Sequence, residues 1–91
     1  MTMFSFAFEL VDGAQSEALY RFFPDRLHTR GASGTVRINA LDWTYLIVDP
    51  SKAKDRGAVS SDEGCISHLI PRLRTKYNEL GMWPALVDFI A

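Results

Sequence analysis

The stretch that decides the fold is residues 3–11, Met-Phe-Ser-Phe-Ala-Phe-Glu-Leu-Val. Along it, large apolar side chains alternate with smaller or polar ones, and the large ones belong to Phe4, Phe6, Phe8 and Leu10. A two-residue period rich in aromatic side chains is typical of a β-strand that buries one face. We therefore predict a strand here, with its phenylalanine face turned toward the core of a sheet.

The segment after this strand has helical spacing. Asp12 and Gln15 have the spacing of a capping box, which predicts a helix that starts near residue 13. Apolar side chains then follow at intervals of three to four residues, namely Leu19, Phe22, Phe23 and Leu27. Pro24 lies within this run and predicts that the helix ends or kinks there.

Two strand signals follow, over residues 35–40 and 43–49, where apolar and polar side chains alternate. Their connection lacks the Asn-Gly or Asp-Gly of a preferred tight hairpin, so one long bent strand is the alternative. Residues 51–61 are polar and without a period, and we expect a mobile loop there.

The strongest helix signal begins after this loop. Ser60 and Glu63 form a capping box and Gly81 fits a C-cap. Between them runs an apolar stripe with helical spacing, made of Ile66, Leu69, Ile70, Leu73, Tyr77 and Leu80. Pro71 lies within the stripe and predicts a bend or a second helix start.

The tail, residues 83–90, alternates like a strand, and a short helix that begins at Pro84 is the alternative. The order is then strand, helix, strand, strand, helix, strand. Two halves of this kind build a four-stranded antiparallel sheet with two helices on one face. We therefore predict an α+β chain with the ferredoxin-like β-α-β-β-α-β fold, forming a single domain over residues 1–91.

The composition limits the classes of function. The chain has 47% hydrophobic and 23% charged residues and a net charge of -1, and a negative balance argues against a dedicated nucleic-acid binder. Cys65 is the only cysteine, which leaves no internal disulfide or cysteine-rich zinc site and fits a reducing compartment, so we expect the cytoplasm. No apolar stretch approaches the roughly 18 residues of a membrane helix. We expect no membrane partner, no metal and no cofactor.

Candidate catalytic side chains are few. Acidic residues lie at or near the ends of predicted strands, where carboxylates can bind Mg²⁺ together with a substrate phosphate; they are Glu9, Asp12, Asp42 and Asp49. Asp also ends strands and caps turns, and we favour that interpretation. A structural role is likewise favoured for the other reactive side chains, His28, His68 and Cys65.

Candidate binding residues form three groups. Basic side chains cluster in one run of Lys52, Lys54 and Arg56 and in another of Arg72, Arg74 and Lys76. These runs are candidates for contacts with phosphate or a partner, with solvation as the alternative. Aromatic residues on a sheet face without helices would mark an interface, and the candidates are Trp43, Tyr45 and Trp83.

Two functions from different classes fit these observations. The first is a small non-enzymatic binding or regulatory module, of the inhibitor, antitoxin or immunity type, which acts through protein–protein contacts and forms a homodimer. The second is a nucleic-acid-binding protein or a Mg²⁺-dependent endoribonuclease. The negative net charge favours the first.

A short resemblance accompanies the second function. Residues 6–11 resemble the first strand of small ferredoxin-like proteins of the virulence-associated protein D type, with Glu9 where an Asp is expected. The resemblance implies that Glu9 lies next to a metal ion. It also implies phosphate contacts from Arg72, Arg74 and Lys76.

Overall fold

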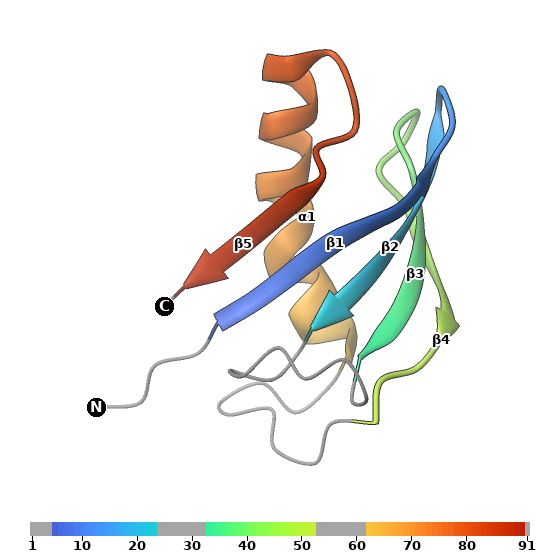
Figure 1. The fold of residues 1–91 in the computed structure, drawn as a ribbon, viewed down its shortest axis with the longest axis vertical. Helices are drawn as coiled ribbons and strands as arrows, with labels where there is room; N and C mark the ends of the chain where they lie inside the picture. The colour runs from blue at the N-terminus through green and yellow to red at the C-terminus, as the bar shows by residue number, and fades with distance from the viewer. Residues whose placement is uncertain (1–4, 24–32, 53–61, 91) are drawn as a thin grey trace.

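The computed structural model describes residues 5–23, 33–52 and 62–90, which form one antiparallel sheet and one helix (Figure 1). The strands are β1 (Ser5–Gly13), β2 (Glu17–Phe23), β3 (Gly34–Asn39), β4 (Tyr45–Asp49) and β5 (Leu86–Ile90), and the helix is α1 (Asp62–Leu80). The strand order is β4-β3-β2-β1-β5. The first four strands therefore form a meander, and α1 carries the chain to the far side of β1, where β5 pairs with it.

The predicted ferredoxin-like fold, with four strands and two helices, is wrong. The segment expected to form the first helix is β2, which pairs with both β1 and β3. Its buried side chains Ala18, Tyr20 and Phe22 recur every second residue and face the core. The helical spacing was misleading because Leu19 and Phe23, on the opposite face of the strand, are also apolar. The described residues thus contain five strands and one helix.

The other predicted elements are confirmed. The strand over 3–11 corresponds to β1, and the signals over 35–40 and 43–49 are two separate strands, β3 and β4. The tail contains β5 and not a helix. The long helix is α1, which continues through Pro71 and ends at Leu80. Gly81 follows it with a φ of 70°, which fits a left-handed C-cap.

Some sequence predictions lie outside the described residues. They are the end or kink at Pro24, the place of Leu27 in the first predicted helix, the cap at Ser60, and the predicted loop from residue 53 onward.

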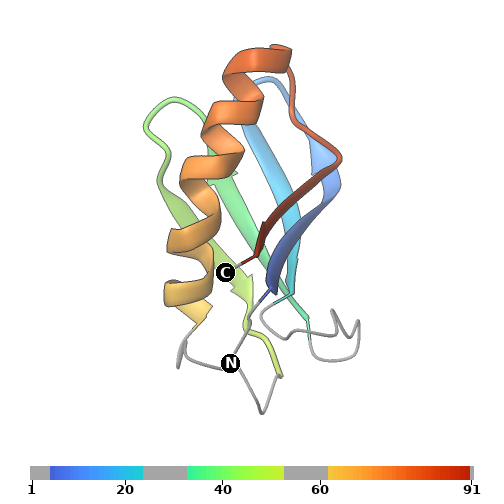
Figure 2. The same ribbon diagram turned by 90° about the vertical axis from the view of Figure 1, so that its left-hand side faces the viewer.

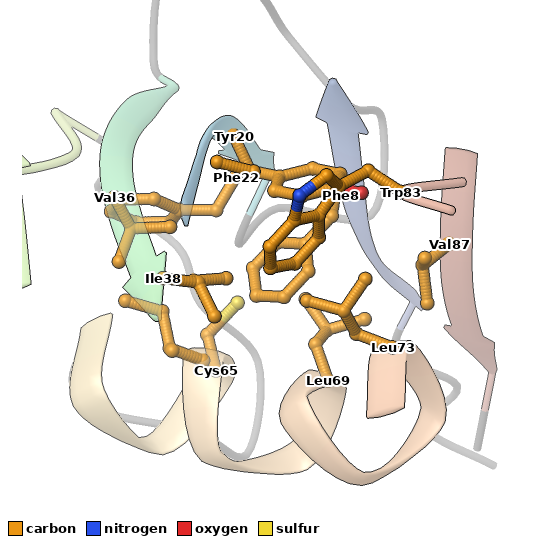
Figure 3. Packing of buried hydrophobic residues seen from close by; sticks show 12 residues of the cluster. Phe8, Tyr20, Phe22, Val36, Ile38, Cys65, Leu69, Leu73, Trp83 and Val87 are labelled. Atoms are coloured by element: carbon orange, nitrogen blue, oxygen red, sulfur yellow. The ribbon is translucent and has the colours of Figure 1, made fainter. Parts of the chain in front are cut away.

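The core lies between α1 and one face of the sheet, as the side view shows (Figure 2). The buried apolar residues of the helix recur at helical spacing, and they are Cys65, Ile66, Leu69 and Leu73. The sheet contributes Phe8, Tyr20, Phe22, Val36, Ile38 and Val87, and Figure 3 shows these two layers facing each other. All ten side chains are 0% exposed. Full burial of one large apolar side chain contributes roughly 1.5–3 kcal/mol, so this layer is the main source of stability.

The other face of the sheet, here called the open face, is not covered by any helix or strand of the described residues. Two ion pairs lie across its strands. Arg21 Nη1 is 3.1 Å from Glu9 Oε1, and Arg37 Nε is 3.0 Å from Glu17 Oε1. Such partly exposed pairs stabilise little, typically about 0–1 kcal/mol each. These two ion pairs therefore contribute little to the stability of the fold compared with the buried core.

Candidate binding surfaces

The two carboxylates proposed as catalytic do not converge. Glu9 lies in the middle of β1 and accepts a hydrogen bond from Arg21. Asp12 is exposed, next to an irregularity in the β1–β2 register that leaves Val11 without a partner in β2. Within the described ranges, no group of three His, Cys, Asp or Glu side chains is placed to hold a metal ion.

The other two acidic candidates have structural partners. Asp42 Oδ1 accepts hydrogen bonds from the Thr44 hydroxyl at 2.7 Å and from the Thr44 backbone N–H at 3.1 Å. These bonds favour the charged carboxylate and lower the pKa of Asp42 below its usual value. Asp49 Oδ2 accepts a hydrogen bond from the Thr35 hydroxyl at 3.1 Å across the β3–β4 pair. Both residues thus act as turn or strand-end partners.

The basic runs lie on different elements. Lys52 is exposed just beyond β4, whereas Lys54 and Arg56 lie outside the described residues. Arg72, Arg74 and Lys76 are all exposed on α1. His68 is also exposed on α1, and His28 lies outside the described residues.

The two tryptophans proposed as interface residues belong to an aromatic cluster on the helix side of the sheet. Trp83 is only 8% exposed, and its indole N–H donates to the Ala14 carbonyl at 2.6 Å. The half-buried ring of Trp43 lies 5.5 Å from Tyr77 and 5.9 Å from Trp83, both edge-on. Trp83 is therefore a buried residue that packs against Trp43, and it is not itself exposed to a partner.

Trp43 has an unusual backbone conformation. Its φ of 58° lies in the left-handed region, which a bulky residue rarely adopts. Such a conformation costs on the order of 1–3 kcal/mol and persists only where the surroundings hold it. Here the ring contacts with Tyr77 and Trp83 offset the cost, so the β3–β4 turn is fixed to the helix side of the molecule.

Eight large apolar side chains are exposed in the described residues. Val11, Leu80, Met82 and Leu86 lie elsewhere in the fold, and four more lie on β4 and on the turn before it. These four are Leu41, Tyr45, Leu46 and Val48, with exposed fractions of 81%, 36%, 65% and 44%. We call these four residues the β4 edge patch. β4 is an end strand of the sheet, and residues 45–48 carry no charge. Tyr45 pairs with the core-facing Ile38, and Leu46 pairs with Arg37 of the open face, so the patch extends over both sides of the strand.

The opposite end strand, β5, differs from β4. It carries the exposed Asp88 at its centre and packs closely against α1. A charged side chain in an edge strand is a common protection against pairing with another chain. Of the two end strands of the sheet, β4 is therefore the one whose edge is better suited to accept a partner.

Comparisons with models of known protein families, with characterised proteins and with solved structures gave no match. The resemblance to the virulence-associated protein D type also loses its structural basis, because the sheet with one helix is not ferredoxin-like. Sequence reasoning proposed Tyr45 as an interface residue but missed Leu41, Leu46 and Val48. The available signal was the uncharged run Tyr45–Val48, which is apolar at every position and so on both faces of its strand.

Proposed function

We propose that this chain is a non-enzymatic binding module that acts through protein–protein contacts, and that it forms a homodimer in which β4 pairs with β4 of a second copy. The observation that carries the proposal is the β4 edge patch, on an end strand that has no charge over residues 45–48. A regulatory protein of the inhibitor, antitoxin or immunity type needs such a contact surface and no catalytic centre.

The backbone of β4 supports pairing with another strand. Only one of its edges is bonded to β3, so the N–H and C=O groups of the other edge point away from the sheet. Natural edge strands are usually protected by charge, proline, a bulge or a covering segment. β4 has an irregular register near Thr35, but no charge or proline in residues 45–48. A second antiparallel strand would satisfy these backbone groups and continue the sheet.

The side chains of β4 also suit a two-fold interface. In a two-fold pair, residue i of one copy faces residue j of the other, and j faces i. If the antiparallel pair is centred on Leu46, residues 45–47 face one another, and if it is centred on Ile47, residues 46–48 do so. Asp49 then faces residue 43 or 45 and not its own copy, so no like charges are opposed. Each apolar cross-strand pair contributes roughly 0.2–1 kcal/mol.

A charge placed on the edge tests this interface. The wild-type chain should have about twice the monomer mass of 10.3 kDa in analytical ultracentrifugation. Leu46→Lys should be a monomer, because dimerisation would bury the new ammonium group. Leu46 is 65% exposed, so the free energy of unfolding of the monomer should change by only about 0.5 kcal/mol or less.

Leu86→Lys is the matched control. Leu86 is 56% exposed and lies on β5, the other end strand, so this variant receives the same charge at the opposite edge and should remain a dimer. A monomeric wild-type chain at its highest soluble concentration would contradict the proposal. So would a dimer that Leu86→Lys disrupts and Leu46→Lys leaves intact.

A further inference from the structure

A polar hollow lies where β4 ends. Its volume is about 500 Å³, which is within the range of roughly 300–1,000 Å³ of small-molecule sites. Its polar lining includes the side chains of Arg21, Thr35, Asp49 and Lys52. None of them belongs to the β4 edge patch.

The strand register brings the polar side chains of the hollow together. Arg21 pairs with Thr35, and Thr35 pairs with Asp49, so the three residues form one row across β2, β3 and β4. The middle strand begins at Gly34, and the small Ser33 just before it also lines the hollow. At Gly34 an added Cβ would lie 2.5 Å from the Asp49 carbonyl oxygen and from the Phe22 ring, so only glycine allows the strands to approach here.

The two cations of the hollow are attached to fixed parts of the structure. Arg21 is anchored through Nη1 by Glu9 at 3.1 Å, and the remaining guanidinium N–H groups are geometrically suited to further acceptors. Lys52 follows Ser51, whose backbone N–H and hydroxyl donate to the buried Asp62 at 2.9 Å and 2.5 Å. Asp62 is the first residue of α1. The backbone next to Lys52 is therefore held against the helix.

The carboxylate of Asp49 also lines the hollow and can accept hydrogen bonds from a ligand. Asp49 already accepts a hydrogen bond from Thr35, and an ionised carboxylate has about four acceptor positions. It repels an anion but can accept a hydrogen bond from a hydroxyl or amino group on the same ligand. The lining therefore suits a molecule that carries both an anionic group and a donor.

From this arrangement we infer that the hollow binds a small molecule bearing an oxyanion, either a carboxylate or a phosphate. The oxyanion contacts Arg21 and Lys52, and a donor group of the ligand contacts Asp49. Guanidinium and ammonium groups both form charge-assisted hydrogen bonds with such oxygens. The inference does not depend on dimerisation.

Titration at constant ionic strength tests the site, with inorganic phosphate in one arm and malate, a carboxylate that also carries a hydroxyl donor, in the other. Amide NMR shifts should saturate at residues 33–35, 49, 51 and 52. Saturation in only one arm identifies the chemical source of the oxyanion. Lys52→Gln should weaken binding by about tenfold, because it removes a charge-assisted hydrogen bond. Asp49→Asn should strengthen it by roughly threefold, because a repelling charge is lost while an acceptor remains.

Arg37→Gln is the matched control, since it removes one positive charge from an exposed position of β3 that does not line the hollow. Its affinity should equal that of the wild-type chain. The inference is overturned if neither probe gives saturable shifts. It is equally overturned if Lys52→Gln and Arg37→Gln weaken binding to the same extent, because general surface charge would then account for the effect.

Discussion

Tyr20 shows how one polar atom is accommodated in this core. Its side chain is 0% exposed, and its hydroxyl donates to the Pro84 carbonyl at 2.6 Å, which ties β2 to the segment before β5. Its ring lies 5.4 Å from Phe8 and 6.0 Å from Trp83. Because burial disfavours the charged phenolate, the pKa of Tyr20 is raised well above its ordinary value.

The raised pKa of Tyr20 predicts alkaline destabilisation. Above about pH 10 the unfolded chain loses the phenolic proton while the folded chain keeps it. The unfolded state then binds fewer protons, so the free energy of unfolding should decrease as the pH rises, by up to about 1.4 kcal/mol per pH unit. This contribution is fully present below about pH 10. Denaturant unfolding at a series of pH values from neutral to alkaline measures it.

Tyr20→Phe is the control for this residue. It removes the ionisable group and the hydrogen bond to Pro84, so at neutral pH it should be less stable by roughly 1 kcal/mol. Its further loss of stability in alkali should be smaller than that of the wild-type chain. Equal alkaline losses in both chains would show that other groups cause the effect.

At the scale of elements, α1 contains a local defect. Pro71 lies inside the helix and has no N–H to donate to the Ser67 carbonyl four residues earlier. Pro71 is exposed, so little packing depends on its ring. Pro71→Ala should restore the missing bond and raise the free energy of unfolding by about 1–3 kcal/mol in urea titrations. Arg74→Ala, at a nearby exposed position of α1, should change it by about 0.5 kcal/mol or less. Equal stability of the two variants would contradict this account of Pro71.

The elements also differ in how far the sequence alone predicts them. α1 and β1 were predictable because each has one apolar face and a period maintained over many residues. β2 was not, since Leu19 and Phe23 make its second face apolar and imitate a helical stripe. Asp12 and Gly13 lie within β1, where Gly13 pairs with Ala18, so they end a strand and do not start a helix. The contacts that decide between helix and strand are the long-range pairs with β1 and β3, which local spacing does not contain.

The β4 edge patch could likewise be predicted only in part from the sequence. The sequence shows that Tyr45, Leu46 and Val48 belong to a strand, but their exposure follows from the position of that strand at the end of the sheet. The order of the strands depends on all five of them. The observed order differs from the predicted one because the segment predicted to be the first helix is the strand β2. The hollow was not predictable from the sequence for a related reason. Arg21 and Asp49 lie in one row only because both pair with Thr35 of β3.

At the scale of the whole molecule, stabilising contacts are unevenly distributed. α1 packs most closely against β5 and β1, whereas four of the five residues of β4 are exposed and only Ile47 is partly buried. β4 is therefore the strand with the least packing in the sheet. A second copy paired along β4 would bury part of this exposed surface, so dimerisation and folding should be thermodynamically linked.

This linkage predicts that the melting temperature of the wild-type chain depends on protein concentration. For a folded dimer that unfolds to two monomers, a tenfold increase in concentration should raise the melting temperature by roughly 3–5 °C for a chain of this length. Leu46→Lys should melt at a temperature independent of concentration, because its monomer has no association equilibrium to shift. Leu86→Lys should keep the wild-type dependence. Calorimetric scans over a hundredfold range of concentration distinguish these cases, and a wild-type melting temperature that stays constant would mean that β4 is stable in the sheet without a partner.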